Sequence, residues 1–257
     1  MGQVVATYPA QALAAIRASM ADRTNFLLQM AGMVVNNGFF LVLWILFFAG
    51  FHSVGGWGAA DMALLLGLIM TIVGISGVAF GGYRDMAAVI LSGDVDGLLT
   101  QPKPVLSRLL SRDSLPSAWG DLVVGLAILV GYGHLTPGQA PLAAAGLACG
   151  LVVYLGAATA FASLAFWARG ARSFARDLTD FMILFCSYPG SIFTGASKLA
   201  VYTLLPAGFI VLAPVRLVRA PSLATLATVA GAAVVYAAIA LALFSLGLAR
   251  YRRGATA

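Results

Sequence analysis

The most polar stretch between the long apolar runs of this chain, residues 83–115, carries side chains suited to contacts rather than to bond making. Long connections with apolar patterning of their own are usually functional. Asp94 and Asp96 precede Leu98–Leu99 at a spacing that predicts a short helix, in which the carboxylates either cap the N-terminus or pair with basic groups of a partner. Pro102 would end this helix, because proline lacks a backbone donor.

A second set of polar and aromatic side chains lies inside apolar runs. Asn36, Phe40 and Trp44 fall on one helical face, and a polar residue at membrane depth normally faces protein or a cavity. Hydrogen bonding between helices is the alternative role for the asparagine. A second aromatic stripe follows further along the chain, where core packing is the ordinary explanation. Because aromatic surfaces suit flat or amphipathic molecules, we predict a substrate pathway lined by Asn36, Asn37, Phe40, Trp44, Phe181, Phe185 and Tyr188.

No arrangement for catalysis or metal binding is visible in the sequence. His52 and His134 lack Cys or His partners at ligand spacing. A nucleotide-binding Gly-x-x-x-x-Gly-Lys-Ser/Thr loop is absent, since the only lysines are Lys103 and Lys198. Acidic residues lie only near the ends of the apolar runs, which disfavours transport coupled to protons or sodium. We therefore expect neither a metal nor a cofactor in this chain, and ATP would have to be bound by a separate chain.

The composition is that of an integral membrane protein. Of the 257 residues, 61% are hydrophobic and only 9% are charged, and the mean hydropathy is +0.96. So few charges cannot cover a soluble surface. The net charge of +6 comes from short basic clusters between apolar runs. Such clusters follow the positive-inside rule, so they indicate membrane topology rather than binding of nucleic acid.

The apolar runs predict an all-α fold with six transmembrane helices and both termini in the cytoplasm. This topology places the large majority of basic residues inside and only Lys198, Arg216 and Arg219 outside. The predicted spans are approximately residues 30–51, 62–82, 119–132, 141–167, 178–192 and 223–248.

Two further segments do not fit a complete span. Residues 1–29 have apolar side chains at helical spacing, which predicts an amphipathic helix in the interface plane, with a solvated leader as the alternative. Residues 199–213 are apolar but too short to cross, which predicts a re-entrant or interfacial hairpin on the outer side. Residues 30–257 would then form one transmembrane domain. The residues predicted to form an outer gate are Pro206, Gly208 and Phe209.

The stretch Gly93–Pro102 resembles the segment after the second span in ABC-2 type membrane subunits of ABC transporters, where a Gly-acidic-x-Asp-x-x-Leu-x-x-Pro pattern occurs. The resemblance is to the branch of short permeases without an ATPase domain. It covers nearly the whole chain and includes residues 188–195 and 205–209. This sequence departs from the pattern in having Asp94 where Glu is common and Gln101 where Arg is common.

This resemblance implies the permease subunit of an ATP-driven exporter in a bacterial cytoplasmic membrane. Two permeases, identical or homologous, would sit on ABC ATPase subunits that bind ATP and Mg. The substrate would be lipophilic or amphipathic: a drug, an organic cation or a lipid-like molecule. The alternatives are a non-transporting scaffold subunit, a permease for a polysaccharide or lipid precursor, and a membrane-embedded enzyme. The residues that would dock the ATPase are Asp94, Asp96, Leu98, Leu99, Pro102 and Lys103.

Overall fold

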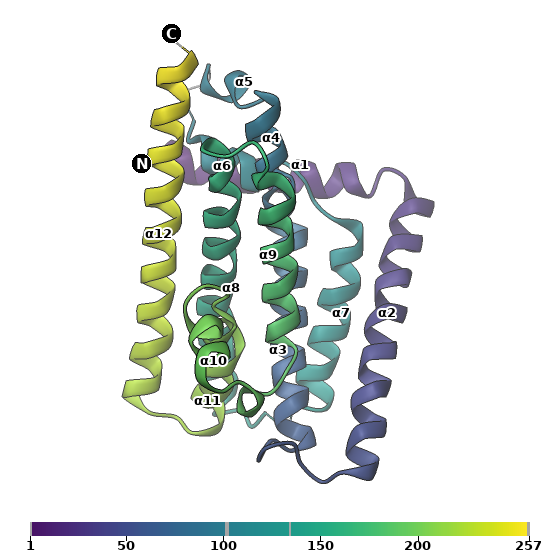
Figure 1. Ribbon diagram of the computed structural model, residues 1–257. Coiled ribbons are helices and arrows are strands. Elements are labelled where there is room, and N and C mark those ends of the chain that lie inside the picture. Colours follow the sequence, from purple (N-terminus) through teal and green to yellow (C-terminus); the bar gives the residue numbers. More distant parts are fainter. Residues whose placement is uncertain (1, 101–102, 134, 256–257) are drawn as a thin grey trace.

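The fold is a bundle of long helices that lie side by side (Figure 1). The computed structural model describes residues 2–100, 103–133 and 135–255, and within them the chain forms helices and no β-strand. The prediction of an all-helical protein is therefore confirmed for these residues. The long helices of the bundle are α2 (Arg23–Gly50), α3 (Ala59–Phe80), α7 (Pro116–Gly131), α8 (Ala140–Ser163), α9 (Ala171–Cys186) and α12 (Leu223–Ala255).

Four helical segments of the described chain are long and apolar enough to cross a membrane: Arg23–Gly50, Ala59–Ser92, Ala140–Phe166 and Leu223–Gly254. Helix α7 is apolar but has 16 residues, which amounts to about 24 Å against about 30 Å of hydrocarbon. Helix α9 also has 16 residues, and its first turns are charged. The structure thus supports a multi-pass membrane protein, while the count of six spans stays a prediction.

Helix α9 differs from the predicted fifth span at both ends. It begins at Ala171 and ends at Cys186, whereas the apolar run predicted residues 178–192. The polar residues before 178 continue the helix as solvated turns, which a criterion based on apolar runs misses. The helix stops short of Pro189, because a proline cannot continue a helix and disfavours the helical conformation in the residue before it.

One end of the bundle gathers the N-terminal helix, the C-terminal turns of α12 and the short helices that follow α3 (Figure 1). We call this the basic end, because Arg84, Arg108, Arg172 and Arg250 lie on or beside these elements. That it faces the cytoplasm stays a prediction. The helices gathered here, besides the end of α12, are α1 (Gly2–Ser19), α4 (Met86–Ser92), α5 (Asp96–Leu99) and α6 (Val105–Leu110).

Helix α1 lies across the basic end and is fixed there by side-chain hydrogen bonds (Figure 1). The Tyr8 hydroxyl donates to the Ala79 carbonyl at 2.8 Å. The predicted N-terminal unit of residues 1–29 is interrupted, because α2 already begins at Arg23, where the Asp22 side chain caps it. The placement of α1 in the membrane interface stays a prediction.

Glycines allow α7 to lie close to both of its neighbours. A Cβ on Gly120 of α7 would lie 2.6 Å from the Met30 carbonyl oxygen of α2, and a Cβ on Gly74 of α3 would lie 2.6 Å from the Leu122 backbone nitrogen of α7. Only glycine permits such an approach of helix backbones. Helix α7 is thereby wedged between α2 and α3, which brings Asp121 against α2.

Helix α3 is the centre of the bundle and α2 is its edge. Leu64, Leu65, Leu68 and Ile72 of α3 are fully buried. By contrast, α2 packs mainly on α7 and leaves most of its apolar side chains exposed, Phe39 among them.

At the opposite end, two short helical arms pack on each other. Helix α10 (Gly195–Tyr202) is followed by a π-helical turn (Gly208–Leu212) that continues into α11 (Ala213–Arg219). The rings of Tyr202 and Phe209 lie 5.3 Å apart, centroid to centroid. The predicted hairpin over residues 199–213 covers the end of the first arm and the start of the second. Its re-entrant position in a membrane stays a prediction.

Candidate functional site

A groove of about 570 Å³ opens between α2, α3, α7 and α9. This volume is within the range of small-molecule sites, roughly 300–1,000 Å³. Its wall is largely apolar and includes aromatic side chains of α2, but it also contains two carboxylates and two amides. The polar side chains that line it are Asn36, Asn37, Asp121, Asp180 and Ser187.

Asn37 and Asp121 form a fixed polar pair in this groove. The Asn37 Nδ2 donates to the Asp121 Oδ1 at 2.7 Å, and both side chains are buried. Hydrogen bonds to a charged acceptor are shorter and stronger than neutral ones, and a surrounding of low dielectric strengthens them further. Within the described residues, no second donor reaches this carboxylate. Its remaining lone pairs are therefore available to a molecule in the groove.

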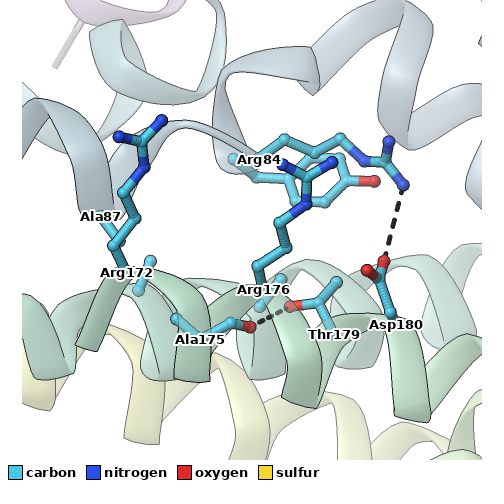
Figure 2. Close-up of a pocket in the computed structure, with 10 residues that line it drawn as sticks. Arg84, Ala87, Arg172, Ala175, Arg176, Thr179 and Asp180 are labelled. Atoms are coloured by element: carbon cyan, nitrogen blue, oxygen red, sulfur yellow. Dashed lines mark hydrogen bonds and ion pairs between the residues drawn. The ribbon is translucent and has the colours of Figure 1, made fainter. Parts of the chain in front are cut away.

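Asp180 connects the groove to the segment that leads away from α3. Its Oδ1 lies 3.8 Å from the Arg84 Nη2, and Figure 2 shows the Arg84 side chain reaching toward it. Among the described residues, Asp180 is the carboxylate that forms an ion pair with Arg84. The Arg84 and Asp180 side chains are 41% and 55% exposed, so solvent screening limits the pair to about 0–1 kcal/mol. An ion pair this weak can be exchanged for another cation.

Tyr83 positions Arg84 for this contact. The Tyr83 hydroxyl shares a 2.9 Å hydrogen bond with the Tyr154 hydroxyl of α8, and both side chains are buried. The two rings also meet edge to face, with centroids 5.7 Å apart. Tyr83 is thus anchored to Tyr154 by a hydrogen bond and a ring contact, which fixes the backbone next to Arg84. A small pocket beside the groove is lined by Tyr83, Arg84 and Asp180 together with Arg172 and Arg176 of α9 (Figure 2).

A second, apolar groove of about 550 Å³ lies further along α2, toward its C-terminal end. It is lined by Trp44, Phe48, Met62 and Tyr132, together with other apolar residues of α2, α3 and α7. The buried Trp44 indole Nε1 has no hydrogen-bond partner in the described chain. The two grooves lie at successive positions along α2, the polar one at residues 36–43 and the apolar one at residues 41–49.

The structure brings only part of the predicted aromatic pathway together. Asn36, Asn37 and Phe40 do line the polar groove, and Trp44 lies beside Tyr188 with ring centroids 6.3 Å apart. On α9, however, a different face meets the groove. Phe181 is exposed, and Phe185 packs on Phe193 at 5.6 Å. Asp180, Ile183 and Leu184 of α9 line the groove, together with Ser187 directly after the helix.

The capping role considered for Asp94 and Asp96 is wrong. Helix α5 is a single turn that begins at Asp96, and Val95 holds its N-cap position with no side-chain capping bond. Asp94 lies outside that position, because Gly93, at φ 85°, ends α4 and turns the chain before it. Both carboxylates are exposed. Their pairing with a partner's basic residues stays a prediction.

The remaining residues of the predicted docking segment are anchored to the bundle. Leu98 and Leu99 are half-buried against the core, and the Arg108 Nη1 donates to the Leu98 carbonyl at 3.2 Å. The Tyr251 hydroxyl of α12 donates to the Gly93 carbonyl at 3.4 Å. Lys103 is exposed, and Pro102 lies outside the described residues. Contact of these residues with an ATPase stays a prediction.

The predicted gate residues lie at the opposite end from the coupling segment. Pro206 and Gly208 are buried, and Phe209 packs between Tyr202 and Tyr236. Their action as a gate stays a prediction. Within the ranges that the structure describes, no group of three His, Cys, Asp or Glu side chains is placed to hold a metal.

Three residues of this site were not singled out from the sequence: Arg84 as a counter-ion, Asp121 and Asp180. The two carboxylates were noted only for lying near span ends. The signal that identifies them is a single charge within or directly beside an apolar run, which must face protein or water rather than lipid. That these three residues meet in one site could not be predicted, because they lie far apart in the sequence.

Comparison with protein families agrees with this architecture. The family model described as ABC-2 family transporter protein matches residues 34–254, which include every lining residue of the polar groove and the segment from α4 to α6. Comparisons with curated proteins and with solved structures gave no match. Since the family model covers well over half of the 257 residues, the chain belongs to the ABC-2 family of transporter proteins.

Proposed function

We propose that this protein is the permease subunit of an ATP-driven exporter and that its polar groove takes a lipophilic or amphipathic cation. Separate ATPase subunits would bind ATP and Mg and dock at the basic end, and a second permease, identical or homologous, would complete the transporter. The observation that carries the proposal is the double role of Asp180, which lines the groove and pairs with Arg84 at the start of the segment leading to α5.

The lining of the groove favours a cation with an apolar body. Asp121 and Asp180 supply two carboxylates, and Arg84 forms an ion pair with the second of them. Phe39 and Phe40 supply aromatic surface on the α2 side. Aromatic faces attract cations, and a cation that is poorly hydrated gains most from such a wall.

Arg84 would couple occupancy of the groove to the segment that contacts the ATPase. A cationic substrate at Asp180 competes with Arg84 for the same carboxylate, so binding frees Arg84 from this ion pair. The reverse also holds: if ATPase closure pulls the α4–α5 segment, Arg84 changes its distance to Asp180 and alters the charge that the substrate meets. Such reciprocity follows for any two sites that share one group.

The size of the groove bears on the alternatives. A volume of about 570 Å³ suits a drug-sized molecule and is small for a polysaccharide chain. A purely structural scaffold subunit would not need two carboxylates beside an apolar groove. Helix α2 leaves an exposed apolar face that either lipid or the second permease can cover.

The test is ATP hydrolysis by the reconstituted complex. The permease is co-expressed with the ATPase from a neighbouring reading frame, purified and placed in lipid, and hydrolysis is measured with tetraphenylphosphonium and with tetraphenylborate. These ions share size and shape and differ in the sign of their charge. We expect stimulation by the cation alone. Equal stimulation by both ions, or no stable complex with the ATPase, would contradict the proposal.

A matched pair of variants locates the effect. Asp180→Asn removes the groove carboxylate, whereas Asp177→Asn changes an exposed carboxylate one turn earlier on α9 and outside the groove. We expect Asp180→Asn to abolish most stimulation while basal hydrolysis and expression persist, and Asp177→Asn to behave as the parent. Equal behaviour of the two variants would show that the groove does not read substrate charge.

A further inference from the structure

A second polar hollow, at the opposite end of the bundle, lies far from the polar groove along the helices. It has a volume of about 380 Å³ and is formed by the loop before α3, the start of α3, and the two arms α10 and α11. The charged residues that line it are Asp61, Lys198, Arg216 and Arg219.

The charges in this hollow do not cancel. Arg219 is committed to Asp61, with Nε 3.1 Å from Oδ1, and its Nη2 donates to the Ala60 carbonyl at 2.9 Å. The second Asp61 oxygen accepts from the Gly58 backbone nitrogen at 3.1 Å. This arrangement neutralises Arg219 and fixes it. Two positive charges, Lys198 and Arg216, are then left without an acidic partner among the described residues that line the hollow.

Two hydroxyls complete the lining. They belong to Ser191, whose Oγ donates to the Val54 carbonyl at 3.5 Å, and to Tyr202. Burial raises the pKa of the Tyr202 phenol, and the neighbouring Arg216 lowers it to a smaller extent. Tyr202 is therefore uncharged near neutral pH, so it adds a donor and no negative charge. Two cations without an acidic partner in the lining, together with the Tyr202 hydroxyl, are suited to an anion with several acceptor oxygens.

The surroundings of the hollow are apolar. Leu199 of the first arm is 66% exposed, Leu204 just after that arm is 57% exposed, and Ile192 is also exposed. Trp57 lines the hollow itself, and Trp and Tyr are typical of the level where hydrocarbon meets headgroups. A soluble anion would gain nothing from these exposed apolar side chains, whereas the acyl chains of a lipid can pack on them.

We propose that this hollow binds the phosphate of an anionic phospholipid headgroup, held by Lys198 and Arg216, with the acyl chains on the Leu199 and Leu204 side. The lipid would join the two arms, because Lys198 belongs to α10 and Arg216 to α11. This inference does not depend on the cation groove or on an ATPase, since it concerns the other end of the molecule.

The test is lipid binding to the purified full-length protein. Binding of dioleoyl phosphatidylglycerol and dioleoyl phosphatidylcholine is measured by native mass spectrometry after delipidation. The variants are Lys198→Gln, Arg216→Gln and the double variant, with Arg250→Gln at the basic end as the control that removes one charge elsewhere. Each Lys or Arg near an anionic membrane surface contributes about 1 kcal/mol, which corresponds to about fivefold in affinity. We therefore expect phosphatidylglycerol to bind about fivefold more weakly to each single variant and about 25-fold more weakly to the double variant. The affinity for phosphatidylcholine should differ less between the parent protein and the variants.

A second arm separates lipid from free anion. Glycerol 1-phosphate carries the same acceptor group without acyl chains, and it is added as a competitor in detergent. We expect it to compete only at far higher concentration than the lipid. Equal affinity for the two would overturn the lipid assignment and leave a soluble phosphate as the ligand. Unchanged phosphatidylglycerol binding by the double variant, with unaltered elution and thermal unfolding, would overturn the site itself.

Discussion

The Asn37 amide and the Asp121 carboxylate meet at 2.7 Å although 84 residues separate them in the chain. The contact exists because Gly120, directly before the aspartate, lets the α7 backbone reach α2. A buried carboxylate with one neutral donor is expensive to keep ionised in an apolar surrounding, so its presence calls for a function beyond packing. We infer that it faces the groove to bind a cation.

The first prediction separates the charge of Asp121 from its hydrogen bond. Asp121→Asn keeps an acceptor for Asn37 and removes the charge, so we expect unchanged thermal unfolding and at least about a tenfold higher concentration of tetraphenylphosphonium for half-maximal stimulation. Asp121→Leu leaves the Asn37 amide buried without an acceptor and should lower the free energy of unfolding by about 1–3 kcal/mol. Normal cation response in both variants would remove Asp121 from the binding site.

The second prediction concerns the close approach of α7 to α2. Gly120→Val places side-chain atoms where the Met30 carbonyl oxygen lies, so the helices must separate and the Asn37–Asp121 bond must lengthen. We expect a loss of about 1–3 kcal/mol of stability, measured by thermal unfolding in detergent. Gly131→Val is the control, since a Cβ there meets nothing within 4 Å. Equal unfolding temperatures for the two variants would contradict this account of the α2–α7 contact.

The third prediction concerns the docking of an ATPase. Leu98→Asp puts a charge on a half-buried apolar position beside the Arg108 hydrogen bond, whereas Thr100→Asp adds the same charge at an exposed position two residues on. Burying an unpaired charge at a contact costs several kcal/mol. We therefore expect Leu98→Asp to lose the ATPase on co-purification while the permease itself elutes normally, and Thr100→Asp to keep it. Full assembly with Leu98→Asp would exclude this segment as the docking element.

The fourth prediction concerns topology. In a background lacking Cys149 and Cys186, we expect Lys198→Cys and Arg216→Cys to react with an impermeant maleimide added to intact cells. Arg250→Cys should react only after the membrane is opened. The reason is that positions 198 and 216 line one hollow at the end opposite residue 250. Labelling of positions 198 and 216 from different sides would show that the two arms do not lie on the same side of the membrane.

The sequence was sufficient for the class of fold and insufficient for the faces of the helices. Long apolar runs with few charges predict membrane-spanning helices, because a helix satisfies its own backbone hydrogen bonds in a bilayer. The all-helical bundle therefore followed from the composition and the lengths of the runs. The stripe of Phe181, Phe185 and Tyr188 illustrates the limit. Lipid is as apolar as a protein core, so an aromatic stripe does not reveal whether it faces inward or outward. The adjacent face, marked by Asp180 and Ser187, is the one that lines the groove.

Contacts that bring distant segments together were also beyond the sequence. Arg84 was counted only as one of many basic residues inside, because nothing in its neighbourhood names Asp180 as its partner. The cap of α5 was misjudged for a more local reason: the left-handed Gly93 moves the helix start past Asp94, and a shift of one residue decides whether a carboxylate caps. Helix ends are the least certain feature of any reading based on spacing.

The enclosed position of α3 has a consequence for how the protein is made. Ribosomes produce chains from the N-terminus, so α3 leaves the ribosome directly after α2, which contacts it little. The helices that enclose it, α7 and α8, follow tens of residues later, and part of its wall comes from the turn at Gly208–Leu212. During that interval the glycine-lined side of α3 has no protein neighbour and faces lipid. A nascent chain truncated after residue 115 should therefore be a preferred client of membrane insertases and a ready substrate for membrane proteases, and one extended past residue 212 should escape both.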